Sequence, residues 1–269
     1  MILGAAALVL ATGSLLAWKL AAQSHDSGLG NGTVSEAAIA DNPPRYFKLL
    51  KHRAEAGNAV AQRLMAKAYF NCLLVSRNPS QFLKERANTT YQPEGSPEAR
   101  IERLARARVK DCARVDGGGQ LTLQQTDHWL NLSAQNGDLA GRAMADMLRY
   151  PPFDKQEAEK FLQEVIASKD PVVVYAYGEV MGSSVTRSLG ESHAPLVSGH
   201  KTKLAWMLAG CRMGNHCGPD SMLATDLCLF EGICAPGDYE QGMKSRLKSD
   251  AERETLDQQI QMVLDAVAK

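Results

Sequence analysis

Six cysteines carry the most evident chemistry in this chain, and four of them are closely spaced. These four follow the pattern C-x5-C-x10-C-x5-C and are Cys211, Cys217, Cys228 and Cys234. An even number of cysteines in such an array is typical of disulfides formed in an oxidising compartment. The alternative is a zinc site with His216 beside Cys217, but structural zinc ligands are usually paired two to four residues apart. The spacing therefore favours disulfides, and we expect no metal site and no cofactor.

Serine and histidine offer weaker candidates for catalysis. Ser198-x-x-Lys201 and Ser245-x-x-Lys248 match the serine-lysine spacing of penicillin-binding enzymes, but the companion Ser-Asp-Asn and Lys-Thr-Gly motifs are absent from the sequence. The sequence also lacks a glycine-rich phosphate loop, a Gly-x-Ser-x-Gly elbow and a His-Glu-x-x-His motif. We therefore expect no catalytic residues and a protein that is not an enzyme.

A segment rich in glycine and serine, Gly182 to His200, is the best candidate for a binding loop. Long insertions between helices are commonly either mobile or used for binding. The loop residues with functional side chains or a fixed backbone are His193, Pro195, Ser198 and His200. If the protein were instead a hydrolase, this loop is where its active site would lie.

Four short segments have the composition of tight turns between the helices that must position these residues. In each, a small or polar residue that ends one helix precedes a polar residue that opens the next. Glycine adopts the left-handed conformation that ends a helix, and Asn or Asp accepts hydrogen bonds from the first free amides of the following helix. Two helices then turn back on each other with almost no loop. The turn residues are Gly57, Asn58, Gly137, Asp138, Asp170 and Gly214.

Other segments agree with an all-α fold. Thr122 with Gln125, Asp154 with Glu157 and Ser249 with Glu252 have the spacing of a helix-opening capping box. The main β-branched run, residues 172 to 174, follows Asp170-Pro171, and proline suits the first position of a helix. We therefore expect a helix there, and stacked antiparallel helix pairs overall.

Three segments repeat the turn and the small residues after it: Ala54 to Ala68 (AEAGNAVAQRLMAKA), Ala134 to Leu148 (AQNGDLAGRAMADML) and Ala167 to Met181 (ASKDPVVVYAYGEVM). The turn pattern A-x-x-G-[ND]-x-x-A resembles Sel1-like repeats, which are related to tetratricopeptide repeats. The first two segments match well, whereas the third and Leu204 to Gly232 match loosely. The resemblance implies an α-solenoid over residues 43–269, whose concave face binds other proteins, often in the bacterial envelope.

The expected helices indicate which cysteines are neighbours. Cys211 falls in the last turn of a helix that begins near Lys203, and Cys217 precedes a helix expected to begin at Pro219-Asp220. Cys228 and Cys234 flank the next turn, so we prefer the pairs 211–217 and 228–234, which would brace residues 203–235. Four cysteines permit three pairings, and the others remain open. Cys72 and Cys112 would then form the third disulfide.

The N-terminal residues 1–20 include an uncharged run from Ile2 to Trp18. At 1.5 Å per residue, such a run nearly spans a bilayer core of about 30 Å. No basic residue precedes it, so we favour an uncleaved membrane anchor over a signal peptide or a buried helix. We interpret residues 21–42 as a flexible tether.

Two signals disagree on which side of the membrane the folded body lies. Basic residues after the apolar run would keep the body in the cytoplasm, whereas the cysteines favour a compartment outside the cytoplasm. We give the cysteines more weight.

The charge balance bears on the partner. Thirty basic residues equal thirty acidic ones, which argues against nucleic acid as a partner. The basic stretch Arg100 to Arg114 is spread over several faces of a helix and suits a solvated surface more than a phosphate or acidic-protein site.

We expect an interaction scaffold anchored in the bacterial inner membrane, with its body in the periplasm, that binds another protein or an envelope component. The alternatives are a cell-wall hydrolase and an envelope immunity or inhibitor protein that blocks a secreted enzyme.

Overall fold

A computed structural model describes residues 34–86, 95–146, 154–181, 189, 193–197, 201–234 and 237–269. Met1–Ser35 form one unit and Glu36–Lys269 another. The expected anchor, residues 1–20, and most of the expected tether lie outside the described residues.

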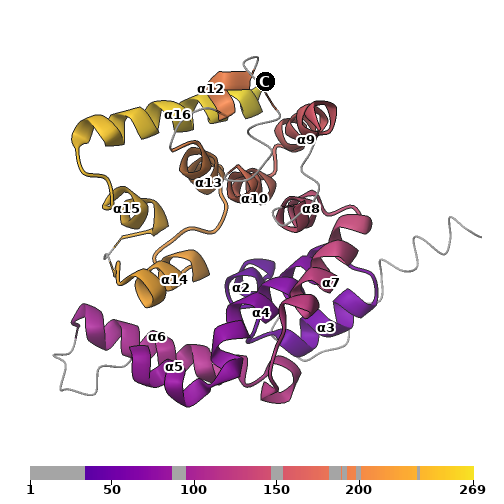
Figure 1. Ribbon diagram of the computed structural model, residues 1–269, viewed down its shortest axis with the longest axis vertical. Helices are drawn as coiled ribbons and strands as arrows, with labels where there is room; N and C mark the ends of the chain where they lie inside the picture. The colour runs from indigo at the N-terminus through magenta and orange to yellow at the C-terminus, as the bar shows by residue number, and fades with distance from the viewer. Residues whose placement is uncertain are drawn as a thin grey trace, which may run out of the picture. The chain divides into compact units, whose positions relative to one another are not determined.

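Every regular element of the described residues is helical, and no strand occurs among them (Figure 1). The first half contains α2 (Glu36–Asp41), α3 (Phe47–Glu55), α4 (Ala59–Arg77), α5 (Pro79–Arg86), α6 (Pro97–Cys112), the 3-10 helix η1 (Val115–Gly118) and α7 (Leu123–Gln135). The second half contains α8 (Leu139–Asp146), α9 (Lys155–Ser168), α10 (Pro171–Val180), α12 (Ala194–Val197), α13 (Thr202–Arg212), α14 (Met222–Glu231), α15 (Tyr239–Lys244) and α16 (Asp250–Ala268). The expected all-α class is confirmed, and the valine run lies in α10.

Three of the four tight turns lie where the sequence predicts them. Gly57 and Gly137 have φ angles of +87° and +91°, and each follows directly on the end of a helix. Asn58 Oδ1 accepts a hydrogen bond from the amide of Ala61 at 2.8 Å, and Asp170 Oδ1 accepts one from the amide of Val172 at 2.8 Å. At the third turn Lys169 takes the left-handed conformation, with φ 51°, in the absence of glycine.

The fourth turn differs from the expectation. Gly214, with φ +114°, follows the end of α13, but the next helix begins only at Met222 and not at Pro219-Asp220. Ser221 caps this helix by accepting a hydrogen bond from the amide of Ala224 at 3.2 Å. The loop between them contains Cys217, whose disulfide with Cys211 ties this loop back to α13.

Successive helices pack in an order that follows the chain. α3 packs on α4, α4 on α7, α7 on α8, α8 on α10, α10 on α13, and α13 on α16. α14 leaves this order and packs on α6 and α15 (Figure 1). Its C-terminal residues Leu229 and Phe230 join the apolar core built by the N-terminal helices, where the Phe230 and Phe82 ring centroids are 6.3 Å apart. The chain therefore returns on itself.

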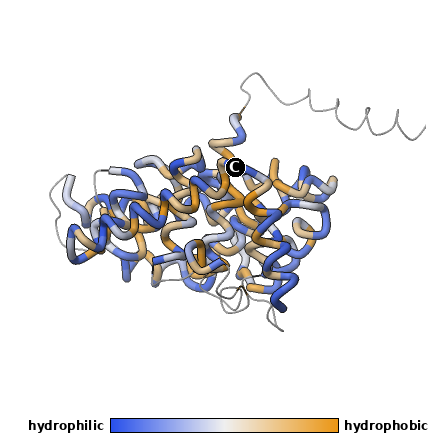
Figure 2. The backbone as a smooth tube through the Cα atoms, turned by 90° about the horizontal axis from the view of Figure 1, so that it is seen from above, coloured by the Kyte–Doolittle hydropathy of each residue, from blue (hydrophilic) through white to orange (hydrophobic). Residues whose placement is uncertain are grey.

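Two apolar cores form, one from α2 to α7 with Leu229 and one from α8 to α16. In Figure 2 the hydrophobic stretches concentrate where helices pack, and hydrophilic stretches follow much of the margin. Small residues permit the closest approach, between α10 and α13. A Cβ atom added at Gly210 would lie 2.7 Å from the carbonyl oxygen of Pro171 and 2.7 Å from the amide nitrogen of Tyr175.

Two segments are more ordered than the sequence predicts. Residues 36–41, assigned to the flexible tether 21–42, form α2, and Ile39 is fully buried in the N-terminal core. Residues 194–197, assigned to the loop, form α12, which packs on α16. A single buried side chain anchors each of these short helices, Ile39 in α2 and Val197 in α12. Neither helix is long enough to show an apolar period.

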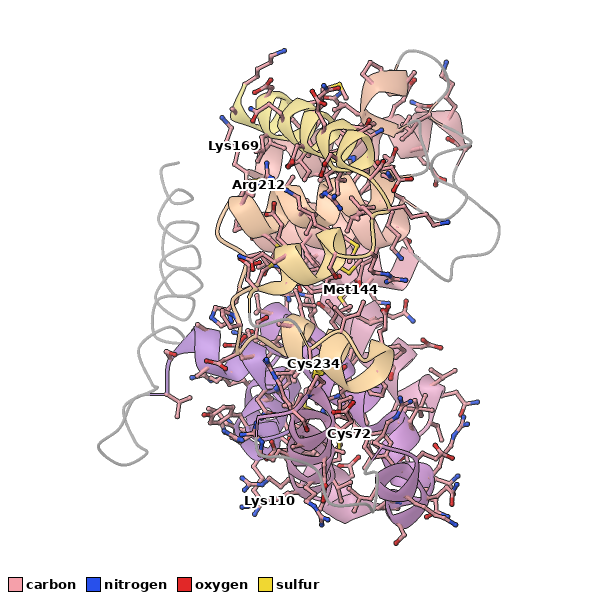
Figure 3. The ribbon with its side chains drawn as sticks, turned by 90° about the vertical axis from the view of Figure 1, so that its left-hand side faces the viewer. Cys72, Lys110, Met144, Lys169, Arg212 and Cys234 are labelled. Atoms are coloured by element: carbon pink, nitrogen blue, oxygen red, sulfur yellow. A yellow bond between two sulfur atoms is a disulfide. The ribbon has the colours of Figure 1, made fainter. Side chains whose placement is uncertain are left out.

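All six cysteines form disulfides: Cys72–Cys112, Cys211–Cys217 and Cys228–Cys234. These are the pairs preferred from the sequence. The first links α4 to the end of α6, the second ties α13 to the loop after it, and the third closes the C-terminal end of α14. Figure 3 shows Cys72 and Cys234 in the same half as Lys110 of α6, with Arg212 and Lys169 in the other half.

We expect Gly210→Ala to lower the free energy of unfolding by about 1–3 kcal/mol, because the added methyl group meets backbone atoms that do not move aside easily. Denaturant unfolding measures this effect. Gly218→Ala is the matched control, since a Cβ atom added there has no other atom within 4 Å and the change should be neutral or slightly stabilising. Equal effects of the two substitutions would contradict close packing of α10 on α13.

Removal of the Cys72–Cys112 disulfide by paired alanine substitutions should destabilise the protein more than removal of Cys228–Cys234. The cysteines are 40 residues apart in the first pair and 6 in the second. Loop-closure entropy then predicts that the free energy of unfolding falls by about 4 kcal/mol without the first disulfide and by about 2 kcal/mol without the second. Denaturant unfolding of the two double variants under identical conditions shows which disulfide contributes more to stability. A larger loss without Cys228–Cys234 would show that loop-closure entropy does not dominate these contributions.

Candidate functional site

The residues of the first two turns serve to join one helix pair to the next. Arg63 Nε on α4 lies 2.6 Å from Asp138 Oδ2, and both side chains are nearly buried. Ser133 Oγ lies 2.8 Å from the carbonyl oxygen of Ala59 and 3.0 Å from Asp138 Oδ2. Asn136 Nδ2 donates to Gln62 Oε1 at 2.9 Å. The turn residues thus stabilise the stack and are not themselves a ligand site.

The expected binding loop is only partly described. Ser198 and His200 lie outside the described residues. His193 Nδ1 is 3.4 Å from the carbonyl oxygen of Leu189, and Pro195 is part of α12. Next to it, Leu196 accepts a hydrogen bond from Trp206 Nε1 at 2.8 Å. The described part of this segment is therefore packed against the C-terminal core.

His216, the cysteine neighbour considered as a zinc ligand, contacts Asp41 of α2 instead. Every cysteine sulfur is engaged in a disulfide. In the ranges that the structure describes, no group of three or more His, Cys, Asp and Glu side chains has an arrangement suited to a metal ion.

A different set of polar residues, on α4, α10, α14 and α15, is linked by electrostatic influence. We call it the junction cluster, and its members are Lys67, Tyr175, Glu179, Asp226 and Tyr239. The return of α14 onto α6 brings Asp226 into this region, where it pairs with Arg108 of α6. Tyr175 and Tyr239 belong to the core of α8 to α16, whereas Lys67 and Glu179 are only partly buried.

Lys67 and Glu179 lie equally far from the starts of their helices. Each is nine residues after the capping residue of its helix, Asn58 in α4 and Asp170 in α10. The sequence analysis missed this pair, although one signal was present: Glu179 is the single charged residue of the otherwise apolar α10.

The surrounding protein shifts the pKa of both groups toward their neutral forms. Desolvation lowers the pKa of Lys67, with a further contribution from Arg63, while Asp226, Glu179 and Asp41 oppose the shift. Desolvation also raises the pKa of Glu179 above its usual 4.5, against the influence of Lys203 and Lys67. Both side chains nevertheless keep partial access to solvent.

Two tyrosines complete the junction cluster. The ring centroids of Tyr175 and Tyr239 are 6.3 Å apart. Burial raises the pKa of each phenol above 10, so both are protonated at neutral pH.

Most charges around the cluster have a partner. Asp138 pairs with Arg63, Asp226 with Arg108, and Asp41 with His216. Glu179 is different, because within the described residues it makes neither a hydrogen bond nor an ion pair. Lys67 Nζ has a single described contact, 3.4 Å from the carbonyl oxygen of Ala40. The two opposite charges influence each other without pairing.

Beside the cluster, α4 exposes large apolar side chains. Phe70 is 57% exposed and Leu74 is 52% exposed. Residues 67, 70, 71 and 74 have the spacing of one helix face. We call this surface, made of Lys67, Phe70, Asn71 and Leu74, the α4 face. It places two apolar side chains next to an ammonium and an amide.

In the described part of the chain, no helix combines the length and apolarity needed to cross a bilayer. Comparison with protein-family models, with curated proteins and with solved structures finds no match for the chain.

We expect Glu179→Gln to stabilise the protein at neutral pH. Because the folded-state pKa of Glu179 is raised, its carboxyl group favours folding fully below pH 4.5, and this contribution is lost as pH rises through the raised value. The variant should thus gain on the order of 1 kcal/mol over the wild type near pH 8 and little below pH 4.5. The difference in free energy of unfolding between the variant and the wild type, measured across this pH range, tests the direction of the effect. Glu254→Gln, at an exposed position of α16, should show no such gain.

Proposed function

We propose that this protein is a non-catalytic binding module of the Sel1-like kind, a short α-solenoid that holds another protein or an envelope component on the α4 face. The order in which α3, α4, α7, α8, α10 and α13 pack supports a stack of helix pairs. The observation that carries the proposal is the exposure of Phe70 and Leu74, one turn apart on a helix that is otherwise deeply packed. Large apolar side chains with polar neighbours are typical of docking surfaces.

The mechanism of binding is preorganisation. Disulfides and interlocked turns hold α4 in place before a partner arrives, so association does not have to order the backbone. An aromatic and a branched aliphatic side chain then supply the apolar contact, while the Lys67 ammonium supplies direction through hydrogen bonds.

The proposed location is the outside of the bacterial inner membrane. Three disulfides support an oxidising compartment such as the periplasm. Residues 1–20 are proposed as the anchor, or as a signal segment removed after export. The tether between anchor and body then spans residues 21–35, because α2 belongs to the folded unit.

Photo-crosslinking of the full chain in its native membranes tests this proposal. A photoreactive amino acid replaces Asn71, and crosslinked proteins are quantified for the wild type and for Phe70→Ser/Leu74→Ser. We expect the double variant to lose the crosslinked partner by about tenfold or more, as for residues at the centre of an interface. Met262→Ser, which removes an exposed apolar side chain from α16, is the matched control and should retain it.

Equal crosslinking by the wild type and the double variant would contradict a partner on the α4 face. Turnover of cell-wall material by the purified protein that is lost on substitution of His193 and His200 would support the hydrolase alternative instead.

A further inference from the structure

We propose that the α4 face binds an acidic amphipathic helix of a partner protein. Two apolar side chains of that helix would cover Phe70 and Leu74, and an aspartate or glutamate beyond each of them would pair with Lys67 and Arg77. The inference rests on the proposed function and deepens it, because it names the chemistry of the partner.

The first argument is the position of two cations around the apolar pair. Lys67 lies three residues before Phe70, and Arg77 lies three residues after Leu74. At 3.6 residues per turn and 1.5 Å per residue, these four positions lie within an arc of about 80° along about 15 Å of α4. Val60, which is 45% exposed, lies on the same side two turns before Lys67. A second helix presents its own side chains three and four residues apart, so a helix packed along α4 can contact all four positions.

The second argument is that these two cations are available to a partner. Arg77 is exposed, and within the described residues it has neither a hydrogen bond nor an ion pair. Lys67 Nζ has the single described contact with the carbonyl oxygen of Ala40, at 3.4 Å. Arg63, the third cation of α4, is instead paired with Asp138 at 2.6 Å. Two cations without an anionic partner therefore flank the exposed apolar side chains.

The third argument is the absence of acidic residues from this part of the sequence. α4 has none, and the sequence has none from Ala59 to Lys84. A carboxylate of the partner therefore meets no like charge on this helix, whereas a basic partner would be repelled by both cations. The α4 face thus favours acidic segments over basic ones.

An anionic lipid surface would also attract apolar and cationic side chains, but the α4 face suits a protein helix better. Binding to lipid headgroups typically uses clusters of about four to eight basic residues, and here two unpaired cations are present. Neighbouring elements also contact the edge of the face. The Ala40 carbonyl oxygen of α2 lies beside Lys67, and Asn71 Nδ2 donates to Met222 Sδ of α14 at 2.7 Å. A single helix needs less open surface than a bilayer does.

Designed peptides test the proposal on the full chain held in phosphatidylcholine nanodiscs. The acidic probe is an alanine-rich helical peptide with two leucines four residues apart and one glutamate three residues outside each leucine. Matched probes replace both glutamates by glutamine, both glutamates by lysine, or both leucines by alanine. Fluorescence anisotropy measures their binding. We expect the acidic probe to bind about fivefold or more tightly than the glutamine probe at low salt, and this preference to shrink as salt screens the two ion pairs. The lysine and alanine probes should bind more weakly than the acidic probe.

Variants assign the contacts. Arg77→Glu should weaken binding of the acidic probe and strengthen binding of the lysine probe, each by about fivefold. Lys67→Gln should reduce the preference for the acidic probe over the glutamine probe, and Phe70→Ser/Leu74→Ser should abolish binding of both. Lys160→Glu, which reverses an exposed charge on α9, is the matched control and should bind as the wild type does. Because Arg77 is exposed, Arg77→Glu should unfold at the same denaturant concentration as the wild type.

Three outcomes overturn the proposal: equal binding of the acidic, glutamine and lysine probes, no binding of the acidic probe up to about 1 mM, or unchanged binding by Arg77→Glu. Association of the nanodisc-held chain with phosphatidylglycerol vesicles that Arg77→Glu abolishes would assign the α4 face to a lipid surface and would also overturn it.

Crosslinking from position 71 separates this proposal from the proposed function. Loss of the crosslinked partner in Phe70→Ser/Leu74→Ser with full retention in Arg77→Glu would leave a partner on the α4 face and exclude an acidic one. Retention in both variants would contradict the partner itself, and with it the acidic helix. We expect loss in both variants.

Discussion

The return of α14 onto α6 is the contact on which the arrangement of the candidate site depends. Three kinds of interaction hold α14 there: the Arg108–Asp226 ion pair, the apolar contacts of Leu229 and Phe230, and the stacking of Arg86 and Arg108 over the Phe230 ring at 5.3 and 5.9 Å. The Cys228–Cys234 disulfide fixes the end of the same helix.

The return of α14 onto α6 also explains why the charges of the junction cluster are shielded from water. Lys67 and Glu179 would be ordinary surface residues on isolated helices. Once α14 and α15 pack beside α4 and α10, their surroundings become less polar, and the free energies of the charged forms rise. A fold selected for stability alone would place apolar residues here.

Local signals predicted most of the fold correctly. Glycines with positive φ, capping oxygens and the Asp-Pro helix start act over a few residues, so they can be recognised without knowledge of the rest of the chain. The exceptions depend on distant contacts. α2 is held by burial of Ile39 and by pairs from Glu36 to Arg53 and from Asp41 to His216. α12 is held by α16 and by Trp206.

The amino-acid sequence by itself determined the helical class, the position of three of the four tight turns and the preferred disulfide pairs, because each follows from backbone preferences and from short distances along the chain. Only the tertiary structure decided that α14 returns to α6, that residues 36–41 join the folded unit, and that Lys67 and Glu179 share one cluster. The physical reason is that burial and charge pairing depend on residues brought together across more than a hundred positions, such as Arg108 and Asp226, which are 118 apart. No local pattern records such a distance.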